Sequence, residues 1–253
     1  MIIVDVHAHI DAFKEEEFER VISNSVNAGV KAIINNGIDK ETNRKTLEIS
    51  KEYKIVKPAL GLHPEFIEKF DKKFIDEEID FIRKQKNKII AIGEVGLDYH
   101  WVKDYSLREK QREMFKEFLL LAKELKKPVI VHSRNAEVDA IKIINKFNLK
   151  KVVMHCFGGS LKLVNEIIKN KWYISIPPII LRSTHFQDIV KIVPLSNILT
   201  ETDSPWLSPY KNKKNEPAFI LETIKKISEI KGLTKEEVSN NIFLNYQRIF
   251  LED

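Results

Sequence analysis

The sequence predicts an α/β protein of the (β/α)₈ class, the TIM barrel, as a single domain over residues 1–253. The main observation is that short apolar runs alternate with amphipathic segments eight times without a linker. A length of 253 residues fits one barrel, although it also fits two smaller domains. A doubly wound open sheet is the alternative topology, but Gly93-Glu94-Val95-Gly96 lacks the spacing of a phosphate-binding glycine motif.

The first half of the chain shows the alternation in order. Residues 15–28 place Phe18, Val21 and Ile22 on one face, as an amphipathic helix does, and Gly29 suits its C-terminal end. Apolar, β-branched runs predict strands, and longer periodic segments predict helices. The further helices are expected at residues 41–53, 74–85 and 106–125, and the strands at residues 2–9, 30–35, 55–62, 88–93 and 128–131.

The second half keeps the same rhythm. Gly158-Gly159-Ser160 precedes a helix, and Pro177-Pro178 ends a strand because proline cannot donate to a strand ladder. A long polar loop, residues 204–217, separates the eighth strand from two closing helices. The strands are expected at residues 152–154, 172–176 and 197–202, and the helices at residues 136–147, 161–169, 184–193, 218–231 and 234–250.

The composition is that of a globular protein with a large core, since 43% of residues are hydrophobic and 31% are charged. Cys156 is the only cysteine, which excludes an internal disulfide and a cysteine-rich zinc site. Any metal must therefore be held by histidine and carboxylate, and Cys156 itself is expected to face the core. The net charge of +5 is compatible with polyanion binding, although lysine and glutamate interleave along the helices as on solvated faces.

The chain start gives no sign of a targeting segment. Met1 leads directly into the first apolar strand, without a basic region or a small-residue cleavage site. No apolar run is long enough to span a bilayer. We therefore expect a cytoplasmic protein without a membrane association, and no feature of the sequence indicates an obligate protein partner.

Ionisable residues at the predicted strand ends indicate a metal site. In a barrel the carboxyl ends of all strands face one mouth, so side chains at these ends converge. Four imidazoles in one cavity without a metal would repel one another when protonated. Six ligands are more than one tetrahedral zinc ion can bind, and they suit two divalent ions bridged by a carboxylate. Such a pair of ions lowers the pKa of a bound water, which favours hydrolysis. The candidate ligands are His7, His9, Glu94, His132, His155 and Asp203.

Six motifs follow one another along the whole chain. They are His7-Ala-His9, Gly93-Glu-Val-Gly-Leu-Asp98-Tyr99, Val131-His-Ser-Arg134, His155-Cys-Phe-Gly-Gly159, Glu201-Thr-Asp-Ser-Pro205 and Asn215-Glu-Pro217. Together they resemble the TatD-type metal-dependent DNases of the amidohydrolase superfamily. The resemblance implies a metallo-dependent hydrolase barrel that cleaves phosphodiester bonds in DNA, often from the 3′ ends of single strands.

The same resemblance implies the roles of the site residues. Two divalent ions, which are Mg²⁺, Mn²⁺ or Zn²⁺, would be bound in the centre. Glu94 would lie between them as a shared catalytic carboxylate, and Asp203 would be the general base acting on the activated water. The implied ligands are His7, His9 and Asp203 for the first ion and His132 and His155 for the second.

Two departures from the family pattern concern substrate binding. Family members commonly have an arginine-rich lead into the Asn-Glu-Pro motif, where this chain has Lys211, Lys213 and Lys214. They also commonly have an aspartate after the arginine of the His-x-Arg motif, where this chain has Asn135. Because lysine offers phosphate a point charge rather than a bidentate fork, substrate binding is expected to differ from that of the other family members.

Other residues near the mouth are candidate substrate contacts. Arg134 suits a phosphate oxygen, with a surface ion pair as the alternative. His63 could contact a phosphate or stabilise the turn before Pro64. The aromatic rings of Tyr99, Trp101 and Trp206 could stack on unpaired bases or pack beneath a loop.

Three functions are compatible with these residues. The first is a metal-dependent nuclease whose partner is DNA, single-stranded or at its 3′ ends. The second is a barrel hydrolase with the same metal chemistry that acts on a small amide, lactone or phosphoester. The third is a non-catalytic nucleic-acid binder, which the retention of all six ligand residues disfavours because binding alone needs no activated water.

Overall fold

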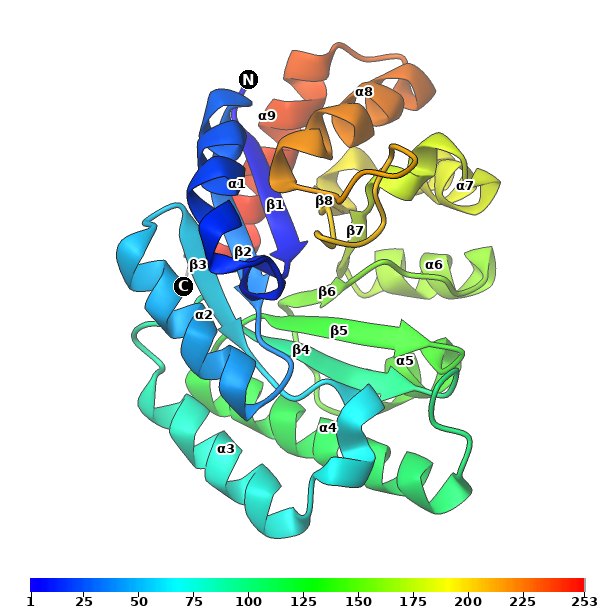
Figure 1. Ribbon diagram of the computed structural model, residues 1–253. Coiled ribbons are helices and arrows are strands. Elements are labelled where there is room, and N and C mark those ends of the chain that lie inside the picture. Colours follow the sequence, from blue (N-terminus) through cyan, green and yellow to red (C-terminus); the bar gives the residue numbers. More distant parts are fainter. Residues whose placement is uncertain (253) are drawn as a thin grey trace.

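Eight parallel strands follow one another around a nearly closed barrel, with helices on its outside (Figure 1). The computed structural model describes residues 1–252. The strand order β1 to β8 equals the chain order, so the predicted (β/α)₈ class is confirmed. The strands are β1 (Ile3–Ala8), β2 (Val30–Asn36), β3 (Val56–Leu60), β4 (Ala91–Asp98), β5 (Val129–Arg134), β6 (Val152–Met154), β7 (Tyr173–Ile176) and β8 (Ile198–Thr200).

The barrel is closed between β8 and β1 by individual hydrogen bonds. The Thr200 hydroxyl donates to the Val4 carbonyl at 2.9 Å. Just beyond the strand, the Asp203 amide donates to the His7 carbonyl and the His9 amide donates to the Ser204 carbonyl, both at 2.8 Å. These bonds fix the loop that carries Asp203 against the strand that carries the two histidines.

Several helices on the outside of the barrel begin with a side chain that caps the first turn. Asp39, Asp71 and Asp104 each accept a backbone N–H of the first helical turn, which satisfies donors that have no partner within the helix. No helix within residues 1–252 has the length and apolar character needed to cross a bilayer. The helices are α1 (Glu15–Asn27), α2 (Lys40–Glu52), α3 (Lys72–Lys84), α4 (Tyr105–Leu125), α5 (Glu137–Asn145), α6 (Leu161–Lys169), α7 (Thr184–Ile192), α8 (Ile220–Lys231) and α9 (Lys235–Tyr246).

Two strands extend further than the sequence predicts. The prediction ended the fourth strand at residue 93 and the fifth at residue 131, whereas the β4–β5 pairing continues to Asp98 opposite Arg134. Glu94 and His132 therefore lie within strands rather than after them. The close pairing requires Gly96, whose φ is +149°, because a Cβ there would lie 2.0 Å from the His132 carbonyl oxygen.

Candidate metal centre

The first group of side chains at the barrel mouth comes from β1, β4 and the loop after β8. The Nε2 atoms of His7 and His9 are 3.1 Å apart, as expected for alternate residues on one face of a strand. Oε2 of Glu94 lies 3.2 Å from Nε2 of His7. Oδ1 of Asp203 lies 3.5 Å from Nε2 of His9 and 3.7 Å from Nε2 of His7. Two imidazole nitrogens and two carboxylate oxygens thus converge on one point.

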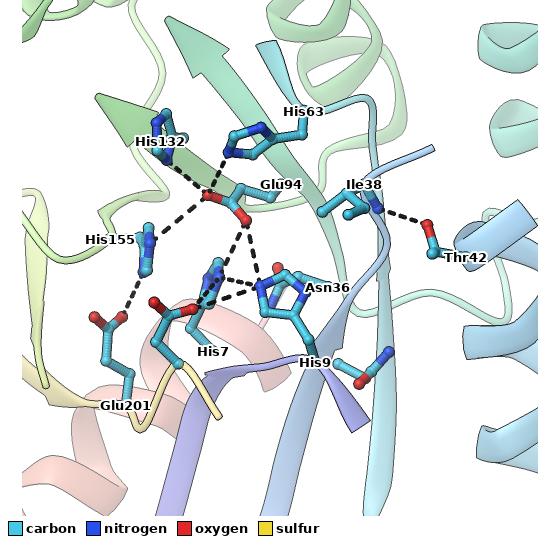
Figure 2. A network of polar contacts seen from close by, with 12 residues as sticks. His7, His9, Asn36, Ile38, Thr42, His63, Glu94, His132, His155 and Glu201 are labelled. Atoms are coloured by element: carbon cyan, nitrogen blue, oxygen red, sulfur yellow. Dashed lines mark hydrogen bonds and ion pairs between the residues drawn. The ribbon is translucent and has the colours of Figure 1, made fainter. Parts of the chain in front are cut away.

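The second group surrounds the other oxygen of Glu94, which lies at the centre of the network (Figure 2). Oε1 of Glu94 is 2.9 Å from Nδ1 of His132, 3.6 Å from Nε2 of His155 and 3.5 Å from Nε2 of His63. Each oxygen of one carboxylate therefore faces its own set of imidazoles. This is the disposition expected of a carboxylate shared by two ions.

The donor set fits divalent cations. His7 and Glu94 are almost completely buried, with exposed fractions of 0% and 3%. Among the described residues, the ligand atoms of His7, His9 and Glu94 lie within 4.8 Å of one another, as do those of His63, Glu94 and His132. Nδ1 of His7 and Nδ1 of His9 are buried without a hydrogen-bond partner in the described part of the chain. Imidazole and carboxylate together suit Zn²⁺, Mn²⁺ and, with more oxygen donors, Mg²⁺.

The carboxylates of the cluster are ionised at neutral pH. Burial acts to raise the pKa of Glu94, but its electrostatic interactions with the imidazoles of His7, His63 and His155 hold it well below its usual value. Burial likewise opposes ionisation of Asp203, and its hydrogen bond with His9 lowers its pKa nevertheless. Both side chains thus supply the negative charge that a cation site needs.

The histidines differ in protonation. Burial lowers the pKa of His7 to about 4, so this imidazole is neutral at pH 7. Burial also disfavours the charged form of His132, but hydrogen bonds with Asp98 and Glu94 raise its pKa to about 9. The negative charge of nearby carboxylates, against the effect of burial, raises the pKa of His155 to about 10. Without a metal, these two imidazoles hold protons that a cation would have to displace.

We therefore expect metal binding to release about two protons at pH 7. The raised pKa values mean that protonation of His132 and His155 stabilises the metal-free fold below pH 6.5, an effect lost as pH rises through 9 to 10. Apparent metal affinity should change in the opposite sense and rise with pH between 6 and 9. Titration calorimetry at pH 7 in two buffers of different ionisation heats measures the released protons, and identical heats in both buffers would contradict the assignment.

Two further carboxylates orient the histidines of the second group. Nε2 of His132 donates to Oδ2 of Asp98 at 2.9 Å, and Nδ1 of His155 donates to Oε2 of Glu201 at 2.9 Å. The opposite nitrogen of each ring is thereby directed at Glu94, as outer carboxylates orient metal-binding histidines. The sequence alone indicates no role for these carboxylates. Both lie in the quoted motifs, but their partners are 34 and 46 residues away in the chain.

Replacement of Asp98 by Asn is expected to weaken metal binding by about 10-fold to 100-fold. Asparagine keeps an oxygen for the Trp101 amide, which donates to Oδ1 of Asp98 at 2.7 Å, but loses the acceptor that orients His132. Competition with a metal chelator dye measures the affinity of each ion. Asp139→Asn is a matched control, because Asp139 accepts from the Tyr99 hydroxyl outside the cavity. Equal affinities in both variants would show that Asp98 does not act on the metal centre.

A cavity of about 470 Å³ opens above the cluster. Of the predicted substrate contacts, it is lined by His63, Arg134 and Trp206, together with Trp101. The structure places Tyr99 elsewhere: its hydroxyl donates to Asp139 at 3.0 Å and accepts from Arg112 at 2.6 Å, so its ring supports a loop. The direction of a loop side chain follows from tertiary packing, which the sequence pattern does not contain. Tyr99 is therefore not among the residues that line the cavity.

The lysines of the loop after β8 are only partly available. Nζ of Lys214 pairs with Glu17 at 2.8 Å, and Nζ of Lys213 lies 4.4 Å from the centre of the Phe219 ring. The neighbouring Asn-Glu-Pro motif has a structural role that the sequence analysis did not assign. The Asn215 side chain donates to the Thr202 carbonyl at 2.7 Å, which holds the segment leading to Asp203.

Comparisons with known proteins agree with this geometry. A family model described as TatD related DNase matches residues 4–251. The chain is 33% identical to an uncharacterized metal-dependent hydrolase of Bacillus subtilis, YabD, with 98% of both chains covered. It is also 33% identical to the human protein named deoxyribonuclease TATDN3, with 98% of this chain and 94% of the human protein covered.

Solved structures show the same architecture. The TatD homologue YjjV of Escherichia coli superposes with a TM-score of 0.90 at 27% identity, over 99% of this chain and 98% of that one. A TatD family hydrolase of Entamoeba histolytica superposes with a TM-score of 0.89 over 99% and 98% of the two chains. At 22% identity, this second likeness bears on the fold alone.

Proposed function

The chain belongs to the TatD related DNase family of metal-dependent hydrolases, and we propose that it is a deoxyribonuclease that removes nucleotides from the 3′ ends of single-stranded DNA. The observation that carries the proposal is the position of Glu94, with one carboxylate oxygen directed at His7 and the other at His132. The likeness to a relative named deoxyribonuclease supports DNA as the substrate.

We assign the metal ligands as the sequence analysis did. His7, His9 and Asp203 would hold one divalent cation, His132 and His155 the other, and Glu94 both. When bound, two such ions supply a water of lowered pKa and neutralise the charge of the phosphoryl group. Mg²⁺, Mn²⁺ and Zn²⁺ are the candidate ions.

The side chains at the barrel mouth then have separate roles in the reaction. Asp203 has 17% of its side chain exposed, against 3% for Glu94, so it is the cluster carboxylate most open to water in the cavity. We assign it as the general base, which accepts the proton of the attacking water on the carboxylate oxygen turned away from His9.

In the part of the chain that the structure describes, no carboxylate pairs with the guanidinium of Arg134, which leaves it available to a substrate phosphate. His63 lines the same cavity, where its Nδ1 accepts from the Glu65 amide at 3.2 Å and its Nε2 lies 3.5 Å from Oε1 of Glu94, and we assign it a contact with the substrate phosphate.

The test is the digestion of a single-stranded oligonucleotide by protein reconstituted with each candidate metal. A 5′-labelled strand should give a ladder that shortens from its 3′ end, whereas a 3′-labelled strand should release labelled mononucleotide at once. The rate should fall steeply as salt rises if phosphate contacts contribute to binding. Loss of the signal in the Asp203→Asn variant excludes a contaminating nuclease.

Other outcomes decide against parts of the proposal. Release of mononucleotide from the 5′ end first would overturn the direction but keep the nuclease. An intact oligonucleotide under every metal, together with turnover of a small amide, lactone or phosphoester, would identify the protein as a small-molecule hydrolase with the same metal chemistry.

A further inference from the structure

Two tryptophans lie exposed at the rim of the cavity. Trp101 is 58% exposed and Trp206 is 50% exposed, and both line the cavity that has Glu94 at its floor. The third tryptophan of the chain, Trp172, is only 2% exposed and donates its indole N–H to the Leu149 carbonyl. Indole rings left half in water beside a reactive centre are typical of binding surfaces rather than of the core.

The two rings stand on opposite sides of the opening. Trp101 follows β4, and Trp206 follows β8. Because the eight strands are arranged in chain order, β4 and β8 lie four strands apart, which is halfway around the barrel. The cavity of about 470 Å³ between them also exposes residues from both halves of the metal centre, such as His9 and His132.

Each tryptophan is fixed to a residue of the metal centre. The Trp206 amide donates to the Asp203 carbonyl at 2.9 Å, and its ring meets that of His9 edge to face at 5.0 Å. The Trp101 amide donates to Oδ1 of Asp98, the carboxylate that orients His132. The backbone of each tryptophan is therefore held at the metal centre, and the Trp206 ring also contacts a candidate ligand, which places both residues where a substrate group can reach them.

The chemistry of the rim suits nucleotides. Every nucleobase has a flat face that stacks on an indole, and one such contact contributes about 1–3 kcal/mol to binding of single strands. The guanidinium of Arg134 lies 5.6 Å from the centre of the Trp101 ring. A cation beside an aromatic ring can bind both parts of a nucleotide, because the cation pairs with the phosphate and the ring stacks on the base.

We propose that Trp101 and Trp206 are two nucleobase subsites, one on each side of the phosphodiester that is cleaved. This inference rests on the proposed nuclease function and makes it more specific. The substrate is a dinucleotide step in which both bases are unpaired, so the base of the leaving nucleotide and the base before it each contribute to recognition. A base that is paired within a duplex cannot enter the cavity at the ends of the β-strands and stack on an indole in this way.

The test uses single-stranded oligonucleotides with one abasic residue. The abasic residue replaces either the 3′-terminal nucleotide or the one before it, and kcat/KM for release of the last nucleotide is compared with that of the intact strand. For the wild-type protein, each replacement should lower kcat/KM by between about 5-fold and about 150-fold, the fold-change that corresponds to one stacking contact.

The variants assign the subsites. Trp101→Ala should become insensitive to one of the two abasic positions and keep its sensitivity to the other, and Trp206→Ala should show the reverse. Trp101→Phe and Trp206→Phe should restore most of the lost sensitivity, because phenylalanine also stacks. Tyr105→Ala is the control, since Tyr105 is a 70% exposed aromatic residue that does not line the cavity.

The outcomes separate the two proposals. No cleavage of the intact strand by the wild-type protein would refute the nuclease function itself. Cleavage that is equally fast with and without the abasic residues would leave that function standing and overturn the base subsites. The same conclusion follows if both alanine variants keep the wild-type response to both positions. Metal content and melting temperature, measured for every variant, ensure that the comparison is made between folded, loaded proteins.

Discussion

Replacement of Glu94 by Gln is expected to remove both ions from the site and to lower hydrolytic activity at least about a thousandfold, a loss of roughly 4 kcal/mol of transition-state stabilisation. The carboxylate is 3% exposed, and its two oxygens face His7 on one side and His132 on the other. An amide supplies only one acceptor and no charge, so one set of imidazoles would face an N–H₂ group. Neither ion would then have its shared ligand.

The measurement is metal content per folded protein after dialysis, together with hydrolysis of a chromogenic phosphodiester. Glu78→Gln provides a control of equal burial, because Glu78 is 2% exposed and accepts from Asn43 at 2.8 Å, away from the centre. That control should lower the melting temperature while retaining both ions. Two ions bound to the Glu94→Gln protein would remove Glu94 from the ligand set.

The barrel could be predicted from the sequence because each strand and each helix produces a hydrophobic pattern within its own residues. β6, at Val152–Met154, and α6, at Leu161–Lys169, begin and end where the apolar runs predict. The pattern was insufficient for β4, because Glu94 reads as the polar residue after a strand. In the structure it belongs to the strand, since polar side chains near the carboxyl end of a barrel strand line the mouth rather than end the pairing.

The convergence of the candidate ligands could also be predicted from the sequence, because they lie near the ends of five strands and need only the barrel to bring them to the mouth. The carboxylates that orient them could not. Glu201 reads as a residue of β8 or of its loop, and nothing local indicates that it meets His155, which follows β6. Such pairings depend on strand register and side-chain direction, which three-dimensional packing decides.

Replacement of Asp203 by Asn is expected to leave the fold intact and to lower turnover by at least about a hundredfold, as removal of a positioned general base does. Asparagine is nearly isosteric and keeps an oxygen that can face His9, which lies 3.5 Å from Oδ1. The Asp203 amide would still donate to the His7 carbonyl. The variant therefore loses the proton acceptor at position 203 but keeps the position of the side chain in the structure.

The experiment compares turnover at saturating metal and substrate, with metal content and melting temperature as checks on the site and the fold. Asp139→Asn again serves as a control, because it removes a carboxylate from helix α5 without altering the cavity wall. The signature of a lost base is a lower kcat at unchanged metal content, whereas a lost ligand lowers the metal content first. A variant that turns over near the wild-type rate with both ions bound would show that another group accepts the proton.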